Sequence, residues 1–307
     1  MSTRYLPEGR LLHAPDNQAA LASLPALARA MDQETVLEGR ATLCTPGHDL
    51  TVALGPFTGV IPREETALGI REGTAREIAI LSRVGKPVAF TVTGLDDSGA
   101  TLLLSRRRAQ ELALEALLDT PAGTILPATV THLEPFGAFV DVGCGVVSLI
   151  GIENISVSRI SHPSCRFRVD QEIYAVLTGS DRAQGRVFLS HKELLGTWLE
   201  NAAAFAPGMT VPGYVRSIQP YGAFIELAPN FAGLADQTEG LAVGDRVSVF
   251  LKSIQPQKMK VKLTVIGKLE EEAPQEPLPY FITGGRLKRW DYSPPECLGR
   301  AMTRVFD

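Results

Sequence analysis

The sequence predicts an all-β chain of three small barrels in tandem, and an internal repeat is the main reason. Residues 123–139 and 208–224 match at seven positions, each pair separated by 85 residues. The pairs are Gly123/Gly208, Pro127/Pro212, Val130/Val215, Pro135/Pro220, Gly137/Gly222, Ala138/Ala223 and Phe139/Phe224. A repeat at a fixed offset indicates copies of one structural unit. Short apolar segments punctuated by glycine and proline then predict β-strands within each copy.

Each copy contains about five short strand-like segments, with one longer connection after the third. The predicted strands are 40–44, 50–54, 59–62, 88–93 and 101–104; 126–133, 138–142, 147–152, 173–177 and 187–189; and 213–218, 223–227, 233–235, 247–251 and 261–263. This count and spacing suit a five-stranded Greek-key barrel of the OB type. In the third copy the repeat offset falls from 85 to 74 residues across the long connection. Because loops tolerate deletions and barrels do not, that connection is expected to lie outside the sheet.

The rest of the chain is expected to form an arm, linkers and a tail. The predicted boundaries are an N-terminal helical arm at 1–33, a divergent first barrel at 34–108, a second barrel at 119–196, a third barrel at 207–267 and an irregular tail at 268–307. Short helical linkers are expected at 109–118 and 193–205.

The arm has helical apolar spacing after a possible cap at Asp16, although Pro25 interrupts it. We interpret it as a packing arm in preference to a partner-binding helix. The tail begins acidic and proline-rich and then becomes aromatic and basic. We expect its aromatic part to dock on the third barrel. Contact with a partner remains the alternative.

Composition limits the classes of function. The 307 residues carry a net charge of −4, which argues against a generally basic nucleic-acid coat but not against local basic patches. The four cysteines form no CxxC pair and the histidines are scattered, so no metal or cofactor site is expected. The first ten residues lack the apolar core of a secretory signal, and no apolar run approaches the ~20 residues of a membrane span. The expected location is cytoplasmic, with no membrane partner.

The repeated motifs carry a family resemblance. They read P-F-G-A-F-V at 135–140 and G-R-V-F-L-S-H-K at 185–192 in the second copy, and P-Y-G-A-F-I at 220–225 and G-D-R-V at 244–247 in the third. With them the chain resembles the S1 RNA-binding domain, an OB-fold domain named after the large RNA-binding protein of the bacterial small ribosomal subunit. The first copy is more distant, but its segments 59–65 and 104–107 are similar to that protein's early repeats. As a whole the chain resembles a short ribosomal protein S1 homologue of the kind found in Gram-positive bacteria.

The resemblance implies a site for single-stranded RNA on one face of the barrel. In the family this site consists of two aromatic residues, a histidine on the third strand, and an aspartate and an arginine before the last strand. The matching residues here are Phe136, Phe139, Asp181 and Arg186 in the second copy, and Tyr221, Phe224 and Lys260 in the third. The histidine position holds Gly151 in the second copy and Asp236 in the third, which are departures from the family.

The first copy lacks the site. Residues 47–50 replace its aromatic element, and Pro62 and Thr101 stand at its histidine and arginine positions. It is therefore not expected to bind RNA by this face. Early repeats of this kind serve as docking modules on the ribosome in the family. The resemblance thus implies the small ribosomal subunit as a partner, through the first barrel and the N-terminal arm.

Cations beside the aromatic rings would neutralise phosphate. The candidates are Arg159, Arg166, Arg168, Arg186 and Lys192 in the second copy, and Arg216, Lys252, Lys260 and Lys262 in the third. Residues 208–268 hold seven lysines and arginines against four acidic residues, which favours a local RNA path. For the arginines at 159–168 a solvated loop is an equally good interpretation.

The orientation of the rings is open at this point. Strand alternation puts Phe136 and Ala138 on one face and Gly137 and Phe139 on the other. Both rings then face outward only if the backbone is irregular, and aromatic residues of small barrels are often core. Gly137 and Gly222 would leave room for a backbone or a base to approach closely.

Three functions were weighed. The leading one is a non-enzymatic protein that binds single-stranded RNA, such as mRNA, in translation or RNA metabolism. The alternative is a protein–protein adaptor whose barrels have lost most of their RNA affinity. An enzyme is disfavoured because the chain has no Gly-rich phosphate loop, H-E-x-x-H motif or G-x-S-x-G elbow, and Glu64–Glu65 is the only tempting carboxylate pair. No catalytic residue is expected.

Overall fold

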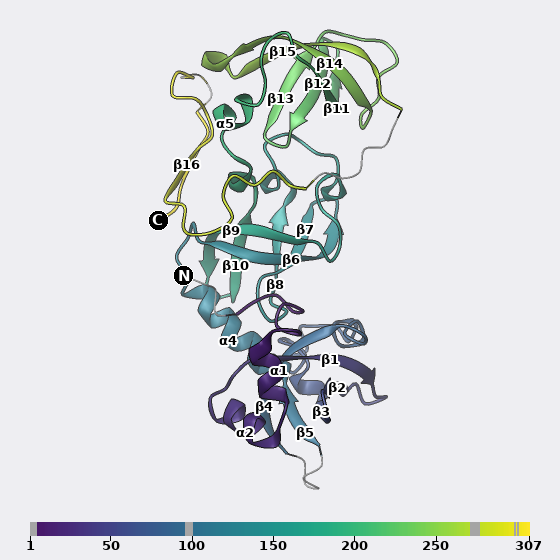
Figure 1. Cartoon of the computed structure of the whole chain (residues 1–307), viewed down its shortest axis with the longest axis vertical. Coiled ribbons are helices and arrows are strands. Elements are labelled where there is room, and N and C mark those ends of the chain that lie inside the picture. Colours follow the sequence, from purple (N-terminus) through teal and green to yellow (C-terminus); the bar gives the residue numbers. More distant parts are fainter. Residues whose placement is uncertain (1–4, 96–100, 271–276, 298, 300) are drawn as a thin grey trace.

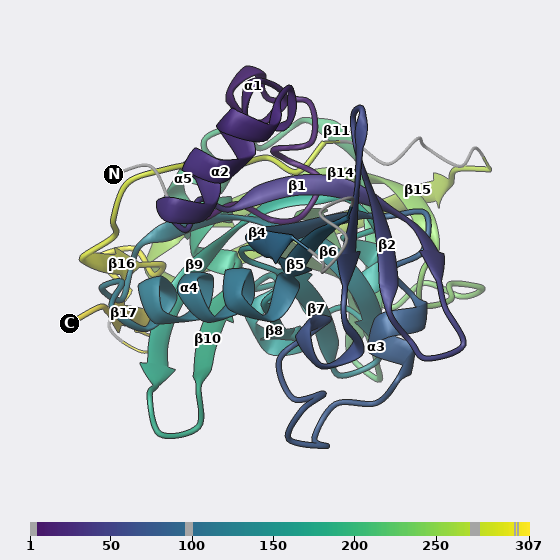
Figure 2. The same ribbon diagram turned by 90° about the horizontal axis from the view of Figure 1, so that it is seen from below.

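The structure is a computed structural model that describes residues 5–95, 101–270, 277–297, 299 and 301–307. It is mostly β, with three five-stranded barrels stacked along the long axis (Figure 1). The first barrel lies at one end, the third at the other, and the middle barrel between them. Seen along that axis, the barrels lie over one another and α1 and α2 pack on the outside (Figure 2). The predicted fold class is confirmed.

Each barrel has five strands in the same order. The strands are β1 Leu37–Cys44, β2 Leu50–Leu54, β3 Phe57–Ile61, β4 Pro87–Leu95 and β5 Leu102–Ser105; β6 Ile125–Glu134, β7 Gly137–Asp141, β8 Val147–Gly151, β9 Glu172–Asp181 and β10 Arg186–Ser190; and β11 Thr210–Gln219, β12 Gly222–Ala228, β13 Phe231–Ala235, β14 Arg246–Gln255 and β15 Lys260–Lys268. The first barrel closes in the order β1-β2-β3-β5-β4 and the third in the order β11-β12-β13-β15-β14. Their β3–β5 and β13–β15 pairs are parallel, whereas the other pairs are antiparallel. The middle sheet runs β10-β9-β6-β7-β8 and curls so that its edges β8 and β10 meet.

Helices are short and lie between or outside the barrels. The described helices are α1 Pro15–Leu21, α2 Leu24–Asp32, α3 Ile78–Leu81, α4 Arg106–Leu118 and α5 Trp198–Ala202, and the 3₁₀ turns are Arg63–Glu65, Ile152–Asn154, Pro163–Cys165, Lys192–Leu195 and Pro256–Lys258. The arm therefore holds two helices where the apolar spacing suggested one. Ser23 caps the second, accepting a bond from the Ala26 amide, and Pro25 lies in its first turn, where proline is tolerated. Asp16 lies in the first turn of α1 and is not its cap.

The linkers also differ from expectation in detail. The first forms α4, which begins three residues earlier than predicted because Ser105 caps it with a bond from the Arg108 amide at 2.8 Å. The second linker is not one helix. Gly196, with φ of 80°, separates its 3₁₀ turn from α5, and a positive φ interrupts a helix.

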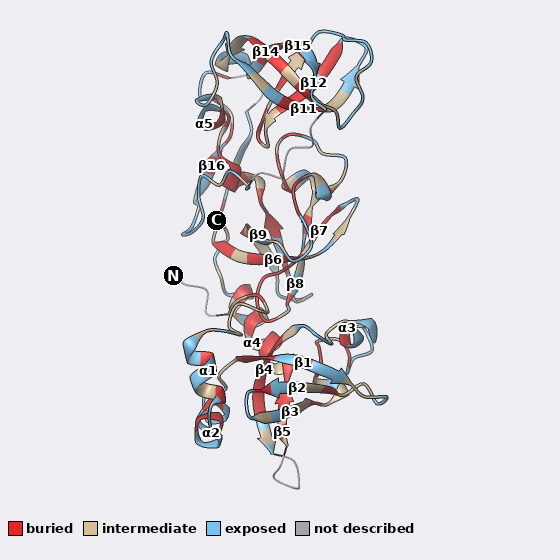
Figure 3. Cartoon of the chain, turned by 45° about the vertical axis from the view of Figure 1, so that its right-hand side comes forward, coloured by how far each residue is buried: buried red, intermediate tan, exposed pale blue. Residues whose placement is uncertain are grey.

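Aliphatic side chains fill each barrel, with a fully buried phenylalanine among them: Phe90, Phe167 and Phe231 in the three barrels in order. Buried segments, in red, occur on strands of all three barrels (Figure 3). The core of the middle barrel continues onto α4 through Ala109 and Ala113. Burial of this apolar surface is the main stabilising contribution to each barrel. Helix α4 belongs by contact to both the first and the middle barrel.

The N-terminal arm joins the first barrel to the middle one through Glu8. The Glu8 carboxylate binds Arg106 of α4, with 2.6 Å between Oε1 and Nε, and accepts the Ala89 amide of β4 at 3.0 Å. Its own amide donates to Asp141 of β7 at 2.8 Å. Burial opposes the ionisation of Glu8, but Arg106 outweighs it and lowers the pKa of this carboxyl. These contacts pack the start of the arm against both barrels.

A second arm contact carries a pH dependence. Glu38 of β1 is fully buried and accepts the amides of Gly9 and Leu11, both at 3.0 Å. Burial raises the pKa of Glu38 to about 7 from 4.5, and burial likewise raises the pKa of Asp141 to about 7. A pKa raised on folding means that the folded state holds the proton more tightly. The contribution of these two carboxyl groups to stability is therefore fully present below their unfolded-state pKa and is lost as pH rises through 7.

We expect Glu38→Gln to reduce this loss. In the wild-type protein the Glu38 contribution falls by up to about 3 kcal/mol between pH ~4.5 and 7, and the neutral amide cannot titrate. Urea unfolding at a series of pH values measures the free energy of unfolding of each variant. The pH dependence contributed by Asp141 should remain in Glu38→Gln. The exposed Glu239→Gln serves as the control. An unchanged pH profile in Glu38→Gln would contradict the assignment.

The tail docks on both the third and the middle barrel, whereas only the third was expected. Its described residues 280–297 and 301–306 form what we call the tail strap, which includes the two-stranded sheet β16 Arg289–Asp291 and β17 Thr303–Val305. Trp290, Tyr292 and Phe306 are buried in the core cluster of the third barrel, which also includes Ile125 and Val176 of the middle one. The strap runs beside both barrels in yellow (Figure 1).

The strap reaches the middle barrel through Tyr280. Its hydroxyl donates to Nε2 of His191 at 3.0 Å and accepts the Tyr174 amide at 3.2 Å. Nδ1 of His191 donates to the Ile155 carbonyl at 2.7 Å, which leaves Nε2 as the acceptor of the neutral ring. Burial lowers the pKa of His191 to about 4. Nε2 of His191 and the phenol of Tyr280 bind one another only while the strap is docked.

We expect Tyr280→Phe to destabilise the protein by about 1–3 kcal/mol, because it leaves a buried imidazole nitrogen and a backbone amide without a partner. Chemical unfolding measures the change. Tyr221→Phe is the matched control, since the Tyr221 side chain is 63% exposed. Equal stabilities for the two variants would show that the strap contact contributes little.

Candidate nucleic-acid interface

The aromatic pair of the middle barrel lies at the β6–β7 turn. Phe136 is 56% exposed, and Phe139 of β7 is half-buried. Their ring centroids are 6.0 Å apart and the rings are nearly perpendicular, at 89°. Because β7 begins at Gly137, Phe136 lies in the turn and outside the strand alternation. Ala138 points into the core, and both rings face outward without a bulge inside the motif.

The third barrel repeats this arrangement. Tyr221 is 63% exposed and Phe224 is 36% exposed. Their centroids are 6.4 Å apart and their planes meet at 87°. Two barrels thus present an open aromatic pair at the same turn.

The glycines of the motif serve the barrel. A Cβ on Gly137 would lie 2.4 Å from the Ile150 carbonyl oxygen, and one on Gly222 would lie 2.1 Å from that of Ala235. Gly222 also has a φ of +143°, which side chains rarely adopt. The close approach anticipated from the sequence is therefore that of the neighbouring strand. It holds the turn, and the ring on it, against the sheet.

His132 belongs to this surface and was missed in the sequence. Its ring stacks on Phe139, with 6.4 Å between centroids and 30° between planes. Nε2 of His132 lies 2.7 Å from a carboxylate oxygen of Glu134. His132 and Phe139 lie opposite one another because β6 shifts register between Val130 and His132. The sequence contains no local sign of this irregularity.

Most of the expected cations lie at the surface. Those whose residues are exposed are Arg159, Arg168, Arg186, Lys252, Lys260 and Lys262. Lys192 is half-buried and donates to the Glu153 carbonyl at 3.0 Å, and burial lowers its pKa. Lys252 pairs at 3.0 Å with Asp236, which occupies the expected histidine position. Asp181 accepts the Gln184 amide at 3.0 Å, so it shapes the β9–β10 turn.

Two of the expected cations are not on the RNA surface. Arg166 is 5% exposed and forms an ion pair with Glu226 of β12. Arg216 of β11 binds the same carboxylate with two bonds, 3.0 Å from Nε and 2.9 Å from NH2. Burial lowers the pKa of Arg166 even though Glu226 opposes the shift. Both arginines, expected as phosphate ligands, are instead bound to the Glu226 carboxylate. Arg166 reaches it from the middle barrel, whereas Arg216 and Glu226 both belong to the third.

We expect Glu226→Gln to destabilise the protein by about 3–5 kcal/mol, since it leaves two largely buried guanidinium groups without their counter-charge. Lys262→Ala, at an exposed position, should change stability by no more than about 0.5 kcal/mol. Urea unfolding of the two variants tests the assignment. A Glu226→Gln protein as stable as Lys262→Ala would mean that this cluster has no structural role.

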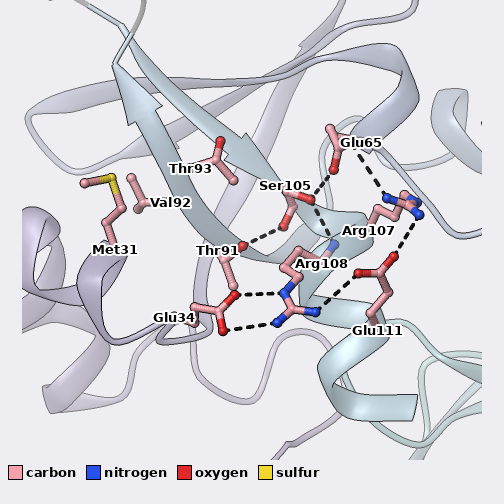
Figure 4. A pocket seen from close by; sticks show the side chains of 10 residues that line it. All are labelled: Met31, Glu34, Glu65, Thr91, Val92, Thr93, Ser105, Arg107, Arg108 and Glu111. Carbon is pink, nitrogen blue, oxygen red and sulfur yellow. Dashed lines mark hydrogen bonds and ion pairs between the residues drawn. The ribbon is translucent and has the colours of Figure 1, made fainter. Parts of the chain in front are cut away.

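The first barrel has a pocket of about 570 Å³ at the start of α4 (Figure 4). None of its ten lining residues is aromatic. Arg108 pairs with Glu34 at 2.9 Å and Arg107 pairs with Glu111 at 2.9 Å. Glu65, the tempting carboxylate of the sequence, accepts a bond from Ser105. The arginines named here thus pair with acidic side chains of the same pocket. The aromatic rings of the other two barrels are open to solvent.

The middle barrel has a groove of about 490 Å³ beside its aromatic pair. It contains Phe139 and Arg186 together with Leu149 and Phe188, which the sequence analysis did not select. Phe188 is 51% exposed. The alternation of β10, with Val187 and Leu189 inward, could have indicated that Phe188 faces solvent.

Other kinds of site were sought among the described residues. In that part of the chain no group of three or more His, Cys, Asp or Glu side chains is placed to hold a metal ion. The four cysteines are free thiols. Among the described helices, none has the length and apolar character needed to span a membrane.

Known proteins match this chain in part. Residues 119–192 match the S1 RNA binding domain. The small ribosomal subunit protein bS1 of Leuconostoc lactis is 32% identical over 207 residues, which are 62% of this chain and 48% of that protein. The bS1 homologue of Bacillus subtilis is 31% identical over 195 residues, 61% of this chain and 50% of that one. The chain spans about half the length of these curated relatives. A multidomain protein with nucleic acid binding domains from Streptococcus pneumoniae aligns over 78% of this chain and 75% of its own, with 14% identity and a TM-score of 0.25.

The match shows that residues 119–192 form an S1 domain, and the first and third barrels have the same number of strands as this middle one. Over 62% of its length the chain is a distant homologue of the bacterial ribosomal protein bS1. The aromatic pair Phe136/Phe139 lies within the matched domain.

Proposed function

We propose that this chain is a non-enzymatic protein that binds single-stranded RNA through its middle and third barrels. The observation that carries the proposal is the pair of open aromatic platforms, Phe136/Phe139 and Tyr221/Phe224, at the same turn of two barrels. Stacking of a base on an aromatic ring is worth about 1–3 kcal/mol and needs little sequence preference. The platforms therefore suit transcripts of varied sequence.

Charge supports the same function. The exposed Arg186 lies in the groove that includes Phe139. In the third barrel Lys262 is paired in register with Leu234, which is itself paired with Phe224, so the cation lies two strands from the ring. Rings take the bases and cations take the phosphates of a single strand. The surface has both groups on each of the two barrels.

The strap and the Glu226 cluster fix the two barrels relative to each other. Two RNA sites on one rigid unit bind one strand with an effective concentration that free domains would lack. We propose that the strand is mRNA or another transcript handled in translation or RNA metabolism, which implies a cytoplasmic location. The homology with bS1 supports the small ribosomal subunit as a partner. We propose that the first barrel and the arm make that contact, because they lack aromatic platforms.

Fluorescence anisotropy of poly(U) with the full chain tests the proposal. The full chain is needed because the strap packs on both barrels. We expect salt-sensitive binding, with a slope of about 0.7 per phosphate contact. Phe136→Ala and Tyr221→Ala should each weaken it about 5- to 150-fold through lost stacking. Leu43→Ala, which removes a 55% exposed apolar side chain from the first barrel, is the matched control.

Absence of salt-dependent binding by the wild-type chain would reject RNA binding. Capture of the same protein partners by wild type and by the double variant, persisting after nuclease treatment, would favour the adaptor alternative.

A further inference from the structure

The middle barrel differs from its neighbours at the seam between β8 and β10. In the third barrel the equivalent strands pair in parallel, with Leu234 opposite Lys262, and the first barrel pairs β3 with β5 in the same way. In the middle barrel β8 and β10 are the edges of the sheet. The Ser148 hydroxyl bridges them, donating to the Val187 carbonyl at 2.7 Å. The seam is held by a side chain where the other two are held by a strand ladder.

The groove of about 490 Å³ lies along this seam. Its apolar walls come from four elements: Leu114 of α4, Phe139 of β7, Leu149 of β8 and Phe188 of β10. Phe188 is 51% exposed and Leu149 is 37% exposed. Exposed apolar side chains that lie next to one another mark a binding surface more often than single, scattered apolar side chains do. The groove therefore suits a flat apolar group that enters from solvent.

The repeat identifies what is particular to Phe188. The 74-residue offset aligns Phe188 with Lys262, and the 85-residue offset aligns Leu149 with Leu234. Leu234 and Lys262 are opposite one another in the third barrel, and the aligned residues Leu149 and Phe188 both line the groove at the open seam. One structural position thus holds a ring in the middle barrel and an ammonium group in the third.

Gly151 also lines the groove, at the position where the family resemblance implied a histidine. A glycine presents no ring there, whereas Phe188 presents one from the opposite strand. We infer that Phe188 and Leu149 form a base slot, in which one unpaired base of a single-stranded RNA stacks on Phe188 next to the Phe136/Phe139 platform. This inference rests on the proposed RNA-binding function and adds a subsite to it.

A base fits this groove better than a peptide strand does. A strand added between β8 and β10 would need about 4.8 Å to each neighbour. The bond between Ser148 and Val187 holds the two edges too close for that. Arg186 lies in the same groove and is exposed, so a phosphate attached to the bound base has a cation beside it. The groove's volume falls in the usual range of ligand sites, roughly 300–1,000 Å³.

The test compares oligouridylate binding by full-length Phe188→Ala and wild type. We expect affinity to fall about 5- to 150-fold, the range of one lost stacking contact. The salt slope should not change, because no phosphate contact is removed. Phe188→Tyr keeps the ring and should restore binding. Val169→Ala is the matched control, since it removes a 49% exposed apolar side chain elsewhere on the same barrel.

Lys262→Ala gives the contrasting result at the equivalent position. It should lower the salt slope by about 0.7, the value for one phosphate on a single strand. Photocrosslinking with a 5-iodouridine oligomer, followed by peptide mass spectrometry, should place an adduct on Phe188.

The outcomes separate the two proposals. Weaker binding by Phe188→Ala, with Val169→Ala and Phe188→Tyr unaffected, supports the slot. Wild-type affinity in Phe188→Ala, together with loss in Phe136→Ala, overturns the slot and leaves the RNA-binding function standing. No binding by the wild-type chain overturns both.

Discussion

Two buried ionic junctions determine how the three barrels sit relative to one another. At the first, Glu8 of the arm binds Arg106 of α4 and, through its amide, Asp141 of the middle barrel. At the second, Glu226 of the third barrel takes Arg166 and Arg216 together. Buried charges are costly unless they are paired with good geometry. Each junction therefore admits few relative orientations of the barrels, and the positions of the aromatic platforms follow from them.

Much of the architecture could be predicted because a repeat with a constant offset constrains strand order, loop position and the motif turn together. The exposure of Phe136 and Tyr221 was expected from the family resemblance, because strand alternation alone left the orientation of the rings open. The locations of Arg166 and Arg216 did not, since a charge in a sequence does not reveal the carboxylate that will meet it from another barrel. Burial of Arg166 depends on Glu226, sixty positions away. Similarly, contact between His132 and Phe139 depends on a register shift with no local signature.

The three barrels share a fold and diverge at single positions. At one equivalent position of the last strand, the first barrel has Leu103, the middle barrel has Phe188 and the third barrel has Lys262. Next to these positions Gly59 and Gly233 allow close strand approach in the first and third barrels, whereas the middle barrel has Ser148, which bridges the strands through its side chain. Changes on the outer face leave the core packing unaffected, so one scaffold can carry an apolar, an aromatic and a cationic surface. Fold and binding chemistry are thus separable here.

The tail strap comes after the middle and third barrels in the sequence. During synthesis the amino-terminal portions emerge and fold first, so the middle and third barrels can form while the strap is still within the ribosome's exit tunnel. At that stage Nε2 of His191 does not yet have the Tyr280 hydroxyl as its partner, and the Asn230 carbonyl does not yet accept the Tyr292 hydroxyl. A nascent chain halted after the third barrel would keep the Arg166–Glu226 ion pair between the two barrels but would lack the contacts of the strap. Synthesis of the strap adds the hydrogen bonds of Tyr280 and Tyr292 to that ion pair.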